Sequence, residues 1–181
     1  MRQTLPLAAA SVVITSEMLE QAAQVVSVAH RSIWTGASGE QSTGESVARH
    51  LESAAGLLVS YGWTRTWSTP AAGQLAPTDA TASAETMLRQ LLDYIREEDS
   101  SPGPITAVTA LTRTAGTAHG DPDTSDIAQA LLNVLVQVLT GSPAARFVPW
   151  SERLHRAPAD IRAMFTAAAA FARTYGPAPA A

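Results

Sequence analysis

The sequence predicts an all-α fold: a compact orthogonal bundle of five to six helices with a flexible N-terminal arm and a Pro/Ala tail. Several segments carry apolar residues at the spacing of an amphipathic helix, and they are bounded by residues typical of helix termini. Only residues 104–116 also suit a strand, and no second strong strand candidate is present to pair with them. We expect a flexible arm over 1–14, a single helical domain over 15–176 and a disordered tail over 177–181.

The first predicted helix lies within residues 15–34. Thr15 or Ser16 can accept a hydrogen bond from the first free backbone N–H groups. The three glycines of residues 35–44 then end the helical pattern. The apolar face of this segment contains Met18, Leu19, Ala22, Val25, Val26 and Ala29.

The second predicted helix has the clearest termini. Ser42 and Glu45 have the spacing of a capping box, in which each side chain satisfies a backbone donor near the other. Gly62 stands where a residue with a left-handed backbone would end the helix. The apolar stripe between these ends contains Val47, Leu51, Ala54, Ala55, Leu58 and Tyr61.

The middle of the chain alternates irregular and helical patterns. Residues 63–82 hold two prolines and a glycine and are typical of an irregular connection, and a helix follows over 83–98. The prolines of residues 99–104 stop that helix. Residues 104–116 suit either a strand or a short helix ended by Gly116, and the absence of a strand partner favours the helix.

Two further helices are predicted in the C-terminal third. Asp123 or Thr124 caps the first of them, which ends before Gly141. Residues 142–157 are predicted to cross between helices without helical structure. The last helix covers 158–175 and starts with proline, which is tolerated at the first helical position.

Three stretches, residues 48–66, 107–116 and 150–172, together resemble an actinobacterial and phage family known only as domain of unknown function 6197. Its members combine a helix ending in Gly-Trp, a segment of small residues, and a Trp-Asn-Asp-x-x-x-Arg-Thr element before a final helix. Trp150 and Arg156 keep the spacing of that last element. The resemblance implies a fold and a setting in an actinobacterium, plasmid or phage, and it implies no reaction.

The resemblance covers about residues 46–175, and the departures from it have physical meaning. Ser151 and Glu152 stand in place of the family's Asn-Asp. Ala157 replaces a threonine that would cap the final helix, a loss of about 1 kcal/mol. Asp160 can still favour the start of this helix through the helix dipole.

Composition narrows the function mainly by exclusion. The formal net charge of −4 argues against a general nucleic-acid coat, and all 12 basic residues are arginine. With no cysteine there is no thiolate metal site and no cysteine nucleophile, which fits a cytoplasmic location. No phosphate loop, nucleophile elbow or membrane span is present, so we predict no catalytic residue, cofactor or metal. Residues 119–126 hold His and Asp side chains but are predicted to form a turn with capping aspartates.

The candidate binding residues are four arginines and one tryptophan in two connecting segments. Arg65 and Trp67 follow the second helix, and Arg146, Arg153 and Arg156 lie in the most basic stretch of the chain. If the two segments meet in space, they form an Arg/Trp surface for a partner protein or a nucleic acid.

Two other tryptophans are predicted to be structural. Trp63 and Trp150 are expected to plug the ends of the bundle, with arginine side chains lying over them. For Trp67 a core position and a surface position are equally favoured. We therefore predict a non-catalytic, cytoplasmic helical module for protein–protein interaction or regulation, with a protein partner or a second copy and no membrane. The alternative is a nucleic-acid-binding accessory or regulatory protein that uses the Arg/Trp surface.

Overall fold

The computed structural model describes residues 12–29, 32–66, 82–99, 103–118 and 120–179. The predicted all-α fold is confirmed: the described residues form helices and two isolated β-bridges but no sheet. The helices are α1 (Ser16–Ser27), α2 (Gly44–Tyr61), α3 (Ala84–Asp99), α4 (Ala107–Ala115), α5 (Pro122–Thr140), α6 (Phe147–Ser151) and α7 (Pro158–Tyr175).

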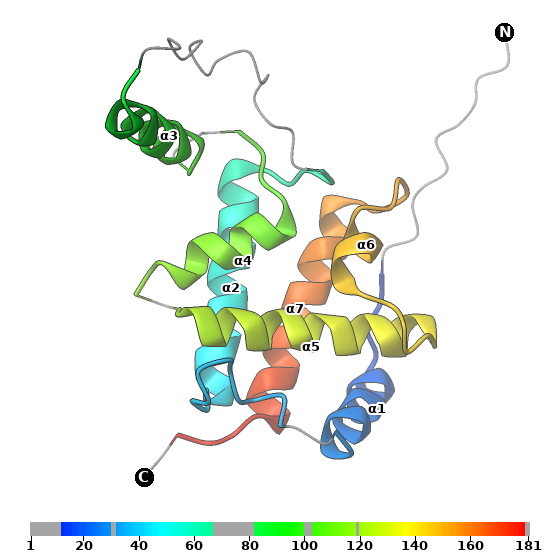
Figure 1. Cartoon of the computed structure of the whole chain (residues 1–181). Helices are drawn as coiled ribbons and strands as arrows, with labels where there is room; N and C mark the ends of the chain where they lie inside the picture. Colours follow the sequence, from blue (N-terminus) through cyan, green and yellow to red (C-terminus); the bar gives the residue numbers. More distant parts are fainter. Residues whose placement is uncertain (1–11, 30–31, 67–81, 100–102, 119, 180–181) are drawn as a thin grey trace, which may run out of the picture.

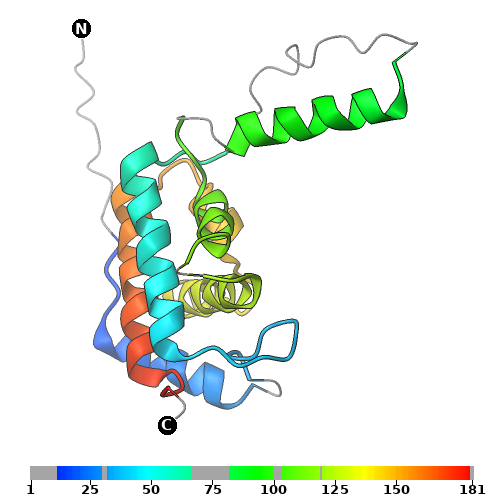
Figure 2. The same ribbon diagram turned by 90° about the vertical axis from the view of Figure 1, so that its left-hand side faces the viewer.

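The centre of the bundle is the antiparallel pair of α2 and α7, which has the most extensive packing of any two helices (Figures 1 and 2). Two glycines allow the backbones to approach at one end of this pair. A Cβ on Gly44 would lie 2.1 Å from the carbonyl oxygen of Ala172 and 2.9 Å from the Cα of Gly176. The N–H of Gly44 donates to the carbonyl of Pro177 at 2.9 Å, which fixes the two ends together.

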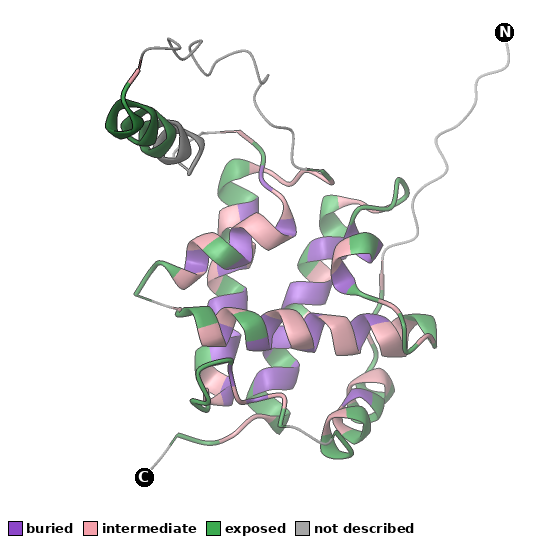
Figure 3. Cartoon of the chain, in the orientation of Figure 1, coloured by how far each residue is buried: buried purple, intermediate pink, exposed green. Residues whose placement is uncertain are grey.

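The remaining bundle helices are layered on this pair. Helix α5 runs across α2 and α7, α4 packs on α2 and α5, and α1 packs on α5, so that buried faces point inward (Figures 1 and 3). The largest fully buried side chains are contributed mainly by α5, α6 and α7. Aromatic rings at the centre of this core include Trp34, Phe147, Trp150, Phe165 and Phe171.

The start of α2 differs from the prediction by one residue. Thr43, and not Ser42, is the N-cap, and its Oγ1 accepts from the N–H of Ser46 at 3.1 Å. The hydroxyl of Ser42 lies instead 3.0 Å from that of Thr124 on α5. The two neighbouring hydroxyls are locally equivalent, and the tertiary contact decides which of them caps the helix.

The start of α5 shows the same effect. Asp121 is the N-cap, and its Oδ1 accepts from the N–H of Thr124 at 2.9 Å, so the predicted caps Asp123 and Thr124 are wrong. Asp123 instead accepts hydrogen bonds from the N–H and the hydroxyl of Ser38 in the connection before α2. The aspartates after residue 118 thus point to different partners.

Two further differences come from aromatic burial. Helix α1 ends at Ser27, well before residue 34, because the chain turns to stack Trp34 on Phe171 at 6.3 Å between ring centroids. The segment predicted to be non-helical contains the short helix α6, which has no side-chain cap. The side chains of Phe147 and Trp150, both in this helix, are buried. Burial, and not a terminal signal, therefore specifies α6.

Within residues 104–116, Ala107–Ala115 form the helix α4, the alternative that the sequence favoured, with Thr106 as its N-cap. Ile105 just before it makes a parallel bridge to Trp63 after α2. Of the predicted arm, residues 1–11 lie outside the described residues, whereas Val12 and Ile14 pack against the core. No described helix has a stretch apolar and long enough to cross a membrane.

Candidate functional site: the arginine end of the bundle

Arg65 is positioned by the end of α2. Gly62 ends the helix with a φ of +82°, a backbone conformation that glycine adopts at low cost. The N–H of Ile105 donates to the Gly62 carbonyl at 3.0 Å, so this end is held by the strand-like bridge before α4. The guanidinium of Arg65 then lies 5.5 Å from the centre of the Trp63 ring.

Arg65 also joins the two segments that the sequence analysis singled out. Its Nη2 donates to the backbone carbonyl of Arg156 at 2.8 Å, across 91 positions of the chain. The connection after α2 and the connection between α6 and α7 therefore meet in space. Trp67, the aromatic residue of the first segment, lies outside the described residues.

Arg156 covers a buried tryptophan. Its guanidinium carbon lies 4.1 Å from the ring of Trp150, which is 1% exposed. Burial lowers the pKa of the Arg156 guanidinium, Asp160 partly offsets this effect, and the neighbouring Arg153 adds to it. The side chain stays protonated, and its charge is only partly solvated.

The nearby buried carboxylate of Asp160 accepts hydrogen bonds from backbone N–H groups. It accepts from the N–H of Val12 at 2.8 Å and from the N–H of Ala157 at 3.0 Å. Asp160 thus stabilises the start of α7 by direct hydrogen bonds as well as through the helix dipole. These bonds supply part of what the alanine at position 157 cannot provide as a cap.

Arg146 and Arg153 border a hollow of about 500 Å³ between the end of α5 and α6. Its floor includes the apolar side chains of Ala145, Pro149 and Trp150. The guanidinium of Arg146 donates to two backbone carbonyls near the hollow, at 2.9 and 3.0 Å. The hollow therefore combines an apolar floor with a basic rim.

We call Arg65, Arg146, Arg153 and Arg156 together the arginine end. None of these four forms an ion pair with a carboxylate of the residues that the structure describes. Three buried N–H donors here also have no acceptor within that part of the chain. They are Nε of Arg65, Nε of Arg156 and Nε1 of Trp150. The site is rich in positive charge and in hydrogen-bond donors.

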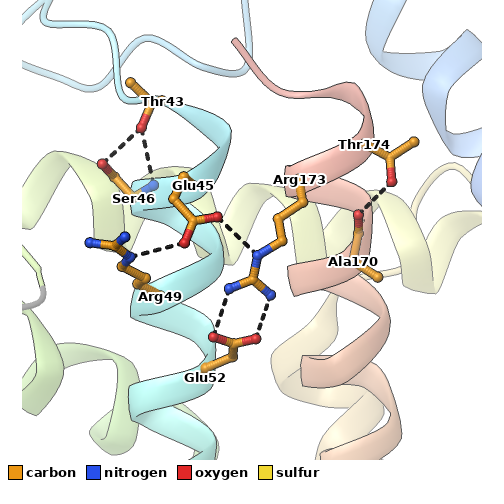
Figure 4. Close-up of polar contacts among 8 residues, drawn as sticks. All are labelled: Thr43, Glu45, Ser46, Arg49, Glu52, Ala170, Arg173 and Thr174. Atoms are coloured by element: carbon orange, nitrogen blue, oxygen red, sulfur yellow. Dashed lines mark hydrogen bonds and ion pairs between the residues drawn. The ribbon is translucent and has the colours of Figure 1, made fainter. Parts of the chain in front are cut away.

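Two arginines outside the arginine end, Arg49 and Arg173, are paired with glutamates. Arg173 on α7 donates to Glu45 and Glu52 of α2, with two of these bonds at 2.9 Å, and Arg49 donates to Glu45 at 2.9 Å (Figure 4). Sequence reasoning missed this cluster. The spacing of four between Glu45 and Arg49 was a signal for one of its pairs, whereas the contact with α7 had none.

A second feature that the sequence analysis missed is a buried histidine on α2. His50 is fully buried, and neither ring nitrogen has a hydrogen-bond partner among the described residues. Burial lowers its pKa, and the backbone of Leu111 and the charge of Asp121 offset this only in part. Gly120 packs directly on the ring: a Cβ there would lie 2.3 Å from Nδ1. The imidazole is therefore held neutral behind the polypeptide backbone.

A model of a family of unknown function, DUF6197, matches residues 42–171. The chain belongs to the DUF6197 family. The match spans α2 to α7 and so includes the whole arginine end, while α1 lies before it. No curated protein and no solved structure matches this DUF6197 chain significantly.

Proposed function

We propose that this DUF6197 chain is a non-catalytic protein–protein interaction module whose arginine end binds an acidic, partly apolar segment of a partner protein. One observation carries the proposal: the four arginines of the arginine end form no ion pair with a carboxylate of the described residues. Carboxylates supply the acceptors and the charge that this site lacks.

The hollow supports a protein segment as the ligand. Ala145 and Pro149 among its lining residues can hold an aliphatic side chain, and Arg146 and Arg153, which also line it, can bind a flanking carboxylate. Apolar anchors surrounded by charged contacts are the usual arrangement of a specific protein interface.

Nucleic acid is the second candidate, because arginines that form no ion pair within the described residues can also bind phosphates. The geometry favours it less. Trp150 is buried beneath Arg156, so its ring offers no stacking surface for a base. The net charge of −4 further opposes binding to a polyanion away from the arginine end.

Fluorescence anisotropy distinguishes the two candidates. The full chain is titrated into a labelled amphipathic helical peptide of leucine and glutamate, a scrambled peptide of the same composition, and single- and double-stranded oligonucleotides. We expect saturable binding of the amphipathic peptide, weaker binding of the scrambled peptide, and a loss of affinity of about tenfold for Arg153→Ala and for Arg156→Ala. Arg49→Ala, an exposed arginine outside the arginine end, is the matched control and should bind as the wild type does.

Each possible result of this titration supports or contradicts the proposed function of the arginine end. Peptide binding that is lost in the two variants and kept in the control supports the proposal. Tighter binding of the oligonucleotide, with log affinity falling steeply against log salt, would replace it with the nucleic-acid function. Absence of binding to all probes would remove the arginine end as a recognition surface.

A further inference from the structure

Helix α3 carries an apolar face that the other described residues leave open. Met87, Leu88, Leu91 and Leu92 recur at helical spacing, and each is 45–58% exposed. Such a row of large side chains in water is unfavourable, and helices in proteins are stabilised mainly by packing a face of this kind. Helix α3 is not among the helices that pack extensively on one another, and it stands away from them (Figures 1–3).

The charge of α3 is opposite to that of the arginine end. Its sequence, AETMLRQLLDYIREED, has five acidic residues against two arginines, a net charge of −3. Glu85 and Arg89 pair with each other at 2.9 Å on the helix surface. The remaining acidic residues are not matched in number by basic residues of the same helix.

These properties match the hollow of the arginine end. The leucine face of α3 suits the apolar residues that line the hollow, and the net negative charge of the α3 sequence suits Arg146 and Arg153, which also line it. Laying the apolar face of an amphipathic helix into a groove is a common mode of protein recognition, with anchors at the spacing seen in α3. Charge complementarity then sets the orientation of the helix and excludes other partners.

The same molecule does not bring the two together. In Figure 1, α3 and α6 lie on opposite sides of the chain. Only residues 100–104 separate the end of α3 from Ile105, which is bonded to the end of α2. The six Cα–Cα steps from Asp99 to Ile105 span at most about 22 Å, so the C-terminal end of α3 stays near the end of α2.

We propose that α3 of one copy of this chain docks on the arginine-rimmed hollow of a second copy, and that the exchange is reciprocal. This inference rests on the proposed function and names its partner. Because each chain carries both elements, two copies form two identical contacts around a two-fold axis, as in most homodimers. In the dimer, the apolar face of α3 is buried in both copies. The carboxylates of α3 from one copy supply the negative charge at the arginine end of the other.

Sedimentation equilibrium of the full chain tests the proposal. We expect a species of about twice the 18.9 kDa of one chain. Leu88→Glu with Leu91→Glu should weaken the dimer at least about tenfold, and so should Arg153→Glu. All three positions are exposed, so circular dichroism should show the helical content of the wild type. Val28→Glu, at an apolar residue of comparable exposure beside α1, is the control and should leave the dimer intact.

Mixing gives a test that loss of folding cannot imitate. The Leu88/Leu91 variant keeps an intact hollow, and the Arg153 variant keeps an intact α3. A mixture of the two can form one of the two docking contacts, so we expect a heterodimer at concentrations where each variant alone is monomeric. Failure of the mixture to recover any dimer would contradict reciprocal docking.

The remaining outcomes separate this inference from the function on which it rests. A chain that is monomeric at all concentrations, or a dimer that only Val28→Glu weakens, overturns the α3 exchange. If the leucine–glutamate peptide still binds the arginine end of that monomer, the interaction function stands and its partner is another protein. If the peptide also fails to bind, both proposals fall.

Discussion

The two arginine clusters of this chain differ in what surrounds them. On the α2–α7 face, Arg173 is bonded to Glu45 and Glu52, which raises its pKa and lowers the pKa of both carboxyls (Figure 4). At the arginine end, burial lowers the pKa of Arg156 and no carboxylate pairs with it within the described residues. The same residue type therefore joins helices in one region, and in the other it forms no ion pair with a carboxylate of the described residues.

The largest effect should come from breaking the support of the arginine end. Trp150→Ala removes a fully buried ring that packs on Phe147 and beneath Arg156. A cavity of this size costs about 3–5 kcal/mol. Urea unfolding should show this loss, and Trp150→Phe should show a clearly smaller one. A cost within 1 kcal/mol for Trp150→Ala would contradict the core position of this ring.

The next largest loss of stability should come from forcing apart α2 and α7, the two helices that Arg173 joins. Gly44→Ala places a Cβ against the backbone of α7, where the nearest atoms cannot move independently. We expect a loss of about 1–3 kcal/mol in the free energy of unfolding. Gly56→Ala lies in the same helix with no atom within 4 Å of the new Cβ, and it should stabilise the protein by about 0.5–1 kcal/mol. Equal effects of the two substitutions would refute the close approach of α2 and α7.

His50 is a buried base outside both arginine clusters. Its titration should make the stability of the protein depend on pH. Its pKa in the folded protein is lowered from 6.5, so the unfolded chain binds a proton that the folded chain does not. Stability should therefore fall as pH drops below about 6.5, toward the lower pKa of the folded state. The midpoint of urea unfolding against pH measures this fall. His50→Gln should flatten the curve.

The smallest effect should come from the exposed ion pairs. Arg173→Gln removes the partner of Glu45 and Glu52, whose lowered pKa values give stability above about pH 4.5 that is lost in acid. We expect a slight loss of stability at neutral pH that disappears in about 1 M salt, where the screening length is about 3 Å. A loss that persists in salt would show that Arg173 acts by packing and not by charge.

Local signals predicted most helix positions, because the apolar periodicity and terminal residues of a helix lie within a few positions of each other. Gly62 and the proline at position 158 ended and began helices as predicted. The errors arose where neighbouring residues could serve equally well as a cap. Thr43 capped α2 because the hydroxyl of Ser42 was bonded to α5, and Asp121 capped α5 because Asp123 was bonded to Ser38.

The candidate site was predictable only in part. Its arginines were visible as the most basic stretch, but no local rule connects Arg65 with Arg156 across 91 positions. Nor could the sequence show that Trp150 would be covered by Arg156, or that Asp160 would be used by backbone N–H groups. These are properties of side chains that meet only after the helices have packed.

The sequence by itself determined the helical class, the order of the long helices and the supply of arginines, because each depends on spacing along the chain. Tertiary structure decided which caps form, where α1 stops and why α6 exists, because burial and long-range hydrogen bonds outweigh small local preferences. Tertiary structure also decided which charged side chains form ion pairs. Packing α7 on α2 paired Arg173 with two glutamates. The connection between α6 and α7 lies beside Arg65 and brings together arginines that form no ion pair with a carboxylate of the described residues.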